Sequence, residues 1–450
     1  MFRWRAMVGV LSAGMLAIYA ILFFQMRQPL RQGYSDFVSF YTAGKILDRG
    51  ASSQLYDIPL QYQIQRAVAP NVQIRQNALP FVRPAYEAWL FWPLACLPYG
   101  VAFALWNLFN GACLILAVLC LRHEVPALHG ISPLLTVAAS LSYFPVFFTI
   151  LQGQDSILIL LIYVLAYRAL RRNRQFVGGM TLGLGIFKFP LVIPFLIPFF
   201  SRKRLPFVFG FALTSFVLAA ASIATVGLST SAYYPRYLLN IDHLARGINR
   251  PADMPNLRGL LSVLLPATSA RAGVVLLILF SVVLLAFVFR KWPVTSSPST
   301  SSSVRPGPDT PPETGAAFAL GFALNVVATV LVSYHCHAFD WSVLLLPMGL
   351  VLGLVLSDEP SFPQPTSRQA TLPEATPPQT ALLQAIQPQT RKFLVWTLSA
   401  LWFSPIYLLI VFTANTPSLL AVLLIAFAVA IGLAISPPLM PIQKQIAARS

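Results

Sequence analysis

Residues 176–200 read FVGGMTLGLGIFKFPLVIPFLIPFF, an apolar run interrupted in its middle by Lys188 and then by three prolines. Basic clusters flank this run on both sides, RRNR at 171–174 and RKR at 202–204. Basic loops of membrane proteins gather in the cytoplasm, so both ends of the run belong on the same side. The sequence therefore predicts two short or broken helices that meet near Lys188, an arrangement that membranes tolerate where it lines a cavity.

The composition of the whole chain explains why such a run is read as a membrane segment. Hydrophobic residues make up 57% of the 450 residues and charged residues only 10%, whereas a soluble domain is about a quarter charged. A chain this apolar cannot cover a globule with polar surface, and intrinsic disorder of its bulk is excluded. The expected fold class is all-α, a polytopic membrane helix bundle.

Further apolar runs are spaced along the chain, each close to the ~20 residues that cross a bilayer. They are Met7–Gln25, Tyr99–Leu121, Ile131–Leu151, Ser156–Leu170, Pro206–Leu228, Ala272–Phe289, Ala316–Val332, Trp341–Leu356, Phe393–Phe412 and Leu419–Ile435. We read the first as a retained span rather than a cleaved signal peptide. Together with the broken run they predict about 11–13 transmembrane helices, with a long first external loop over Met26–Ala85 that contains amphipathic helices.

Two segments rich in Ser, Thr, Pro and Gln are typical of flexible linkers. They divide the chain into a membrane core at 1–290, a cytoplasmic linker at 291–315, two helices with an external turn at 316–357, a second cytoplasmic linker at 358–391, and a C-terminal pair of helices with a basic tail at 392–450.

The net charge of +17 comes from 31 Lys and Arg against 14 Asp and Glu. In a membrane protein this excess fits basic cytoplasmic loops and contact with anionic lipid headgroups. We expect no nucleic-acid partner, because no basic and aromatic module stands outside the apolar segments.

Apart from Glu124, which lies in an expected cytoplasmic turn, the acidic residues outside the linkers gather on the expected external side. This distribution points to binding or chemistry on that face. Asp36 lies about ten residues past the first span, in GYSDFVSFY at 33–41. A carboxylate at the membrane edge can accept a proton from a hydroxyl as a general base. The alternative is a helix N-cap, a position that Asp favours.

Two other places carry polar chemistry near span ends. Lys188 is costly inside an apolar run unless it faces a cavity or an anion, so it is a candidate functional residue. His335, Cys336, His337 and Asp340 form a dense cluster. One short turn seldom supplies enough metal ligands; a histidine that hydrogen-bonds a phosphate fits better, and an interfacial histidine remains the plainer reading. We expect no cofactor, and nothing in the spacing supports a divalent metal.

Several motifs occur together in a fixed order: Ser35-Asp36-Phe37 followed by Tyr41, Gly153-Gln154-Asp155-Ser156, Lys188-Phe189-Pro190, Met254–Gly259 and His337–Asp340. In this order the chain resembles glycosyltransferase family 87, the polyprenyl-phosphate-mannose-dependent mannosyltransferases with the GT-C fold. The resemblance covers about residues 30–350. Asp155 departs from it, since the family often has Asn at that position.

The resemblance implies an inverting hexosyltransferase that passes a sugar, with mannose the first expectation, from a polyprenyl-phosphate donor to a hydroxyl acceptor. It places the active site on the external face of the cell membrane, with Asp36 as general base. The leaving phosphate needs cations rather than a general acid, for which the candidates are Arg83, Lys188, Arg258 and His337. Candidate substrate-binding residues are Tyr41, Gln154, Asp155, Asn256 and Asp340. The partners are the lipid-linked donor, the bilayer and a lipid, glycan or protein acceptor.

A membrane transporter or lipid flippase is the alternative function. Such a protein would also contain a broken helix and a buried lysine, but we would expect inverted repeats and acidic residues at mid-bilayer. The acidic residues lie instead at span ends, which favours the enzyme. A membrane scaffold without chemistry is a third reading.

Overall fold

The computed structural model describes residues 2–69, 79–201, 204–241, 250–266, 270–292, 315–357, 386–411 and 416–435. Within these ranges the chain is helical and contains no strand, which confirms the all-α polytopic bundle. Seven of the described helices are long and apolar enough to cross a membrane, or eight if one bent pair counts as a span. The protein is therefore a multi-pass membrane protein.

This number is smaller than the 11–13 spans expected, because several apolar runs form short or bent helices. The run at 131–151 becomes α6 (Pro133–Leu141) and α7 (Phe144–Gln152), which meet at an angle of 67°. Helices α8 (Ser156–Arg171) and α16 (Ala316–Val332) have 16 and 17 residues and are largely buried in the centre.

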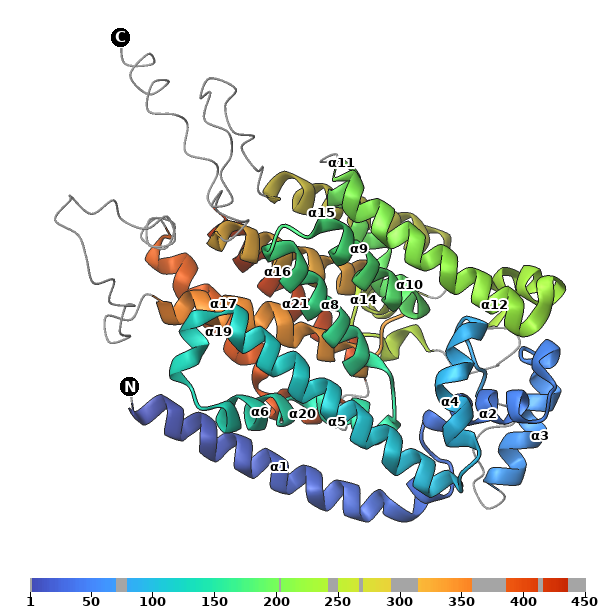
Figure 1. Ribbon diagram of the computed structural model, residues 1–450. Helices are drawn as coiled ribbons and strands as arrows, with labels where there is room; N and C mark the ends of the chain where they lie inside the picture. The colour runs from blue at the N-terminus through green and yellow to red at the C-terminus, as the bar shows by residue number, and fades with distance from the viewer. Residues whose placement is uncertain are drawn as a thin grey trace, which may run out of the picture.

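Four long helices run along the bundle (Figure 1). They are α1 (Phe2–Arg31), α5 (Tyr99–Glu124), α15 (Ala270–Lys291) and α12 (Leu205–Leu239), which is kinked at Gly227, where φ is 82° and ψ is 164°. Large apolar side chains such as Phe216 and Val275 are exposed on them, as expected where lipid rather than water is the surrounding medium.

The segment between the first two spans forms a separate block of helices at one end of the bundle (Figure 1). It contains α2 (Phe37–Asp48), α3 (Ile58–Val68) and α4 (Ala88–Ala95), with short 3-10 turns η1 (Ser52–Gln54) and η2 (Ala85–Glu87). The rings of Phe40 and Phe91 stack with centroids 4.7 Å apart. Aromatic packing of this kind holds α2 against α4.

The interrupted run 176–200 folds as a broken, returning segment. It is helical as α9 (Gln175–Gly183), passes through a 3-10 turn η4 (Leu184–Lys188), and continues as the short elements α10 (Phe189–Val192), η5 (Pro194–Leu196) and α11 (Ile197–Ser201). The backbone at Lys188 is non-helical, with φ −107° and ψ 54°. The predicted break is therefore found at the lysine.

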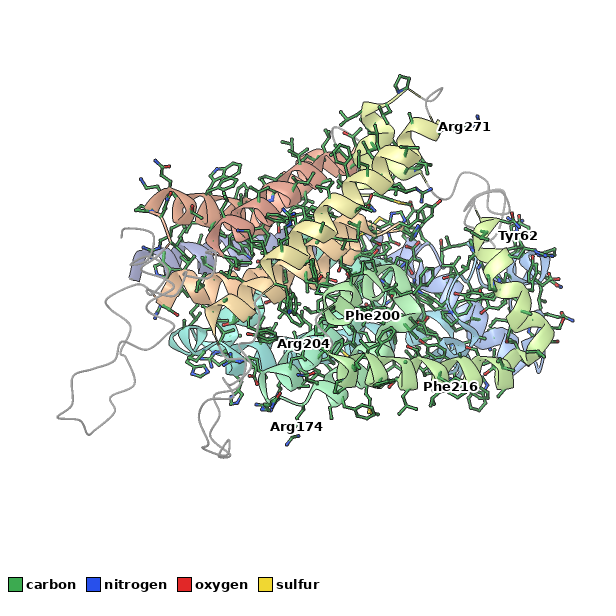
Figure 2. The ribbon with its side chains drawn as sticks, turned by 90° about the horizontal axis from the view of Figure 1, so that it is seen from above. Tyr62, Arg174, Phe200, Arg204, Phe216 and Arg271 are labelled. Carbon is green, nitrogen blue, oxygen red and sulfur yellow. The ribbon has the colours of Figure 1, made fainter. Side chains whose placement is uncertain are left out.

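Glycines show the direction in which α9 packs against α12. A Cβ on Gly179 would lie 1.9 Å from the Phe207 carbonyl oxygen, and one on Gly183 would lie 2.8 Å from the Thr214 Cβ. Contacts that advance together along both helices mean that the helices run in the same direction. Both therefore start at the same end of the bundle, and Figure 2 shows Arg174 and Arg204 close together along its long axis. This is the arrangement predicted from the two basic clusters.

The C-terminal part packs into the same hydrophobic core as α7 and α8. It consists of η8 (Ala338–Leu344), α17 (Leu345–Ser357), α19 (Pro388–Trp402), α20 (Ser404–Leu409), η10 (Pro417–Leu419) and α21 (Leu420–Ala434). The remaining described helices are η3 (Pro126–Gly130), η6 (Pro251–Asp253) and α14 (Leu257–Leu264). Most of both predicted linkers, residues 293–314 and 358–385, lies outside the described residues.

Candidate active site

The turn between α7 and α8 is the centre of the polar site. Gly153 ends α7 with φ 61°, a conformation that favours glycine, and a Cβ there would lie 2.7 Å from the Phe37 Cβ. Its carbonyl oxygen accepts a 2.8 Å hydrogen bond from Trp106 Nε1. The turn is thus fixed against α2 and α5, and it presents Gln154 and Asp155 to the surrounding elements.

Asp36 contacts this turn through two hydrogen bonds. Gln154 Nε2 donates to Asp36 Oδ2 at 3.0 Å, and the Asp36 backbone N–H donates to Gln152 Oε1 at 3.1 Å. Asp36 occupies the N-cap position of α2, but its side chain makes no capping hydrogen bond. The half-buried carboxylate is therefore held by a side-chain amide instead of being used for the cap.

Lys188 is buried in an ion cluster. Its Nζ lies 2.6 Å from Asp155 Oδ1 and 2.5 Å from Asp340 Oδ1. Ser156 Oγ accepts a hydrogen bond from Nζ and donates one to Asp340 Oδ1 at 2.8 Å. The lysine side chain is 4% exposed. Two buried carboxylates, rather than an open cavity, thus balance its charge, as a buried cation requires.

Arg83 extends the cluster on the other side of Asp155. Its Nη2 lies 2.9 Å from Asp155 Oδ2, and its Nε lies 3.8 Å from Glu87 Oε2. Two tyrosines fix the backbone here: Tyr56 OH donates to the Arg83 carbonyl at 2.9 Å, and Tyr234 OH donates to the Val82 carbonyl at 3.0 Å. The guanidinium is 13% exposed and is held towards Asp155.

His337 joins the site at the start of η8. Its backbone N–H donates to Asp340 Oδ2 at 2.9 Å, so Asp340 binds both this N–H and Lys188. Burial lowers the pKa of His337 below its ordinary value, while the negative charges of Asp340, Asp36 and Asp253 act in the opposite direction. The Asp36 carboxylate thus favours the charged form of the half-buried imidazole.

The structure thus brings together most of the residues expected from the sequence. Around the turn at 152–156 it gathers Asp36, Arg83, Gln154, Asp155, Lys188, His337 and Asp340. Arg258 contacts Tyr334, three residues before His337, with its guanidinium 3.9 Å from the Tyr334 ring centroid.

Two of the expected substrate-binding residues have structural partners instead. Tyr41 is buried and donates to the Leu97 carbonyl at 2.7 Å. Asn256 is fully buried at the N-cap of α14, where its Oδ1 accepts from Gly259 N at 2.9 Å. Neither is joined by a hydrogen bond or ion pair to the cluster.

Three residues of the site, Gln152, Ser156 and Glu87, have no role that the sequence alone indicated. Two features of the sequence could have indicated these residues. Arg83 and Glu87 have the i,i+4 spacing of an ion pair, and the polar string QGQDS at 152–156 separates two apolar helices. Among the described residues, no three His, Cys, Asp or Glu side chains are arranged to hold a metal ion.

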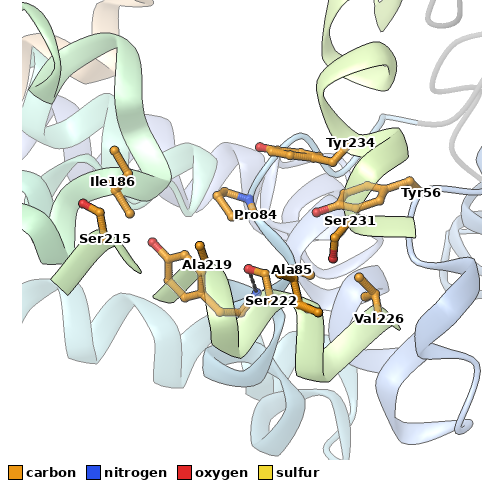
Figure 3. A pocket seen from close by; sticks show the side chains of 12 residues that line it. Tyr56, Pro84, Ala85, Ile186, Ser215, Ala219, Ser222, Val226, Ser231 and Tyr234 are labelled. Carbon is orange, nitrogen blue, oxygen red and sulfur yellow. Dashed lines mark hydrogen bonds between the residues drawn. The ribbon is translucent and has the colours of Figure 1, made fainter. Parts of the chain in front are cut away.

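A cavity of about 300 Å³ lies between η2, η4 and α12. Its lining includes Pro84, Ala85, Ile186, Ala219 and Ile223, together with tyrosine and serine hydroxyls. Figure 3 shows Tyr234, Tyr56 and Ser231 at one end and Ile186 and Ser215 at the other. Pro84, Ala85 and Tyr86 belong to its lining and connect Arg83 to Glu87 along the chain, so the cavity adjoins the ion cluster.

The sequence model of glycosyltransferase family 87 matches residues 81–305, half of the chain. The matched region contains Arg83, Asp155 and Lys188, whereas Asp36 and His337 lie on either side of it. No curated protein and no solved structure matches the chain.

Proposed function

We propose, since the chain belongs to glycosyltransferase family 87, that this membrane glycosyltransferase is an inverting enzyme with a lipid-linked donor. It transfers a hexose, with mannose the first sugar to test, from a polyprenyl-phosphate donor to a hydroxyl acceptor on the external face of the cell membrane. Asp36 acts as the general base.

The observation that carries this proposal is the placement of the Asp36 carboxylate. It is partly accessible, it is oriented by Gln154, and it lies beside a cluster that contains Arg83 and His337. A single displacement needs one base: the acceptor hydroxyl gives its proton to Asp36 as its oxygen bonds to the anomeric carbon. The bond between that carbon and the phosphate oxygen breaks, and polyprenyl phosphate leaves.

The departing phosphate needs positive charge and hydrogen-bond donors. We assign these contacts to Arg83, Arg258 and His337, which are each partly exposed. Lys188 acts indirectly in this proposal, because Asp155 and Asp340 already neutralise its buried ammonium. It is a positioning residue that keeps Asp155 against Arg83.

The cavity beside α12 is our proposed site for the first isoprene units of the donor. Its wall at 84–86 places an apolar chain next to Arg83, and the outer face of α12 exposes apolar side chains such as Phe216. We expect Ala219→Trp to fill the cavity and raise the KM for the donor, while Phe216→Trp on the exposed face leaves KM unchanged. An unchanged KM in Ala219→Trp would exclude this site.

The reaction class is tested with purified protein, polyprenyl-phosphate mannose and a panel of hydroxyl acceptors. The expected product has the opposite anomeric configuration to the donor, read by NMR, and a nucleotide-linked sugar gives no transfer. Direct transfer from the nucleotide sugar, or retention of configuration, would contradict the proposal. Donor movement across vesicles without transfer would instead favour the flippase.

A further inference from the structure

Glu87 is a buried carboxyl group that the mechanism above leaves unused. It is 3% exposed, and neither of its oxygens has a hydrogen-bond partner among the residues that the structure describes. Asp155 Oδ2 is also buried and accepts no hydrogen bond within the described part of the chain, although it lies 2.9 Å from Arg83 Nη2. Arg83 lies against both carboxyl groups, with Nε 3.8 Å from Glu87 Oε2 and Nη2 2.9 Å from Asp155 Oδ2, so the two groups are neighbours. If both groups were ionised, neither would carry a proton to donate. The two Glu87 oxygens and Asp155 Oδ2 would then all remain without a hydrogen bond.

The charges of the cluster are unequal when every acid is ionised. Arg83 and Lys188 supply two positive charges, whereas Asp155, Asp340 and Glu87 would supply three negative ones. An uncompensated charge in a buried site is expensive, and a buried carboxyl group commonly takes up a proton instead. One proton makes this cluster neutral and also provides the missing donor.

We propose that Glu87 is protonated in the resting enzyme and donates a hydrogen bond to Asp155, which positions Asp155 and therefore Arg83. Glu87 is then a positioning residue. Its effect on catalysis rests on the proposed function, whereas its protonation does not.

The groups around Glu87 come from several elements. Arg83 and Tyr86 lie on its own segment, Asp155 on the α7–α8 turn, Lys188 on η4, Tyr56 after η1 and Tyr234 on α12. Burial raises the pKa of Glu87 well above its ordinary value, and Asp155 raises it further, against the opposing effects of Arg83 and Lys188. Loss of the proton at high pH would turn Arg83 from Asp155 towards Glu87.

Infrared spectroscopy of the purified resting protein tests the protonation state directly. We expect Glu87→Gln to remove one carbonyl band of a protonated carboxyl group. The matched control is Glu124→Gln, since Glu124 is also buried but pairs with Arg168, Arg171 and Arg172. That variant should remove no such band. The proposal is overturned if the spectrum of Glu87→Gln keeps every carbonyl band of a protonated carboxyl group that the wild type shows.

Activity tests the positioning effect. Glu87→Gln keeps the donor to Asp155, so we expect wild-type kcat at neutral pH and activity that persists to higher pH. Glu87→Ala loses the donor, and we expect kcat to fall about tenfold. Equal losses in both variants would overturn the positioning role. If the infrared band behaves as expected but polyprenyl-phosphate sugar is not a donor, the proposed function fails and the protonated Glu87 stands.

Discussion

At the scale of single residues, the orientation of the Asp36 carboxylate depends on one side-chain amide. Gln154→Leu removes the 3.0 Å hydrogen bond from Nε2 while keeping a similar volume. We expect kcat to fall about tenfold with little change in folding, because one oriented hydrogen bond is lost at the base. Steady-state kinetics of the purified variant measure this. An unchanged kcat would show that Gln154 does not orient the base.

The ion cluster predicts a large stability effect at Lys188. Lys188→Met leaves Asp155 and Asp340 without their shared cation, so we expect a loss of about 3–5 kcal/mol in the free energy of unfolding. Lys45→Met is the control, because Lys45 pairs with Asp48 at 3.6 Å and the Lys45 side chain is partly exposed. This variant should cost under about 1 kcal/mol. Equal effects on thermal unfolding in detergent would contradict the assignment.

The burial of His335 and His337 predicts that the folded protein loses stability as the pH falls. Burial lowers the pKa of both below the ordinary value, which is ~6.5 for an unfolded chain. As pH falls through that value, the unfolded state takes up protons that the folded state does not, so the stability present above it is progressively lost.

The double variant His335→Gln/His337→Gln should therefore lose less stability than wild type between about pH 7.5 and 5.5. His129→Gln is the control, since His129 is exposed, and it should keep the wild-type dependence. Melting temperatures in detergent across this range measure the difference. Identical pH dependence in the double variant would show that the two histidines titrate normally.

At the scale of elements, close contact between α9 and α12 holds the returning segment in place. A Cβ on Gly179 would lie 1.9 Å from the Phe207 carbonyl oxygen, whereas one on Gly111 in α5 would meet nothing within 4 Å. We expect Gly179→Ala to destabilise the protein by about 1–3 kcal/mol, and Gly111→Ala to have little effect. Thermal unfolding of the two variants measures this, and equal melting temperatures would argue against the contact.

The elements also show what local sequence could predict. Lys188 and its prolines predict a break because proline and a buried charge both oppose a continuous apolar helix. The bend of 67° between α6 and α7 was not predicted, because the run at 131–151 has the length and apolarity of one span. Hydropathy measures how apolar a segment is, not how it bends.

At the scale of the whole molecule, the composition was enough to predict a polytopic bundle, but not the partners of its charged residues. Lys188 was expected to meet a substrate anion, yet its partners are Asp155 and Asp340, the latter 152 residues away. Tyr41 and Asn256 likewise have structural partners. Such pairings depend on how distant helices pack, which a single sequence does not display.

The orientation of the molecule is tested with a native thiol. Cys96 is exposed at the end of α4, whereas Cys113, Cys120 and Cys336 are buried. We expect a membrane-impermeant maleimide to label Cys96 in intact cells, because the α2–α4 block is proposed to face outward. Arg174→Cys, made in a Cys96→Ser background, should be labelled only after permeabilisation. The reverse pattern would place the site on the cytoplasmic side.

In the proposed reaction Asp36 takes the proton of the acceptor hydroxyl. The most direct test of this role is transfer from polyprenyl-phosphate sugar by Asp36→Asn, compared with Asp57→Asn. Asp57 caps α3 in the same block by accepting from Leu60 N at 2.8 Å, and Asn is an equally good cap. We predict that Asp36→Asn folds normally but loses about 10²–10⁴-fold in kcat, while Asp57→Asn stays active. Wild-type kcat in folded Asp36→Asn would contradict the claim.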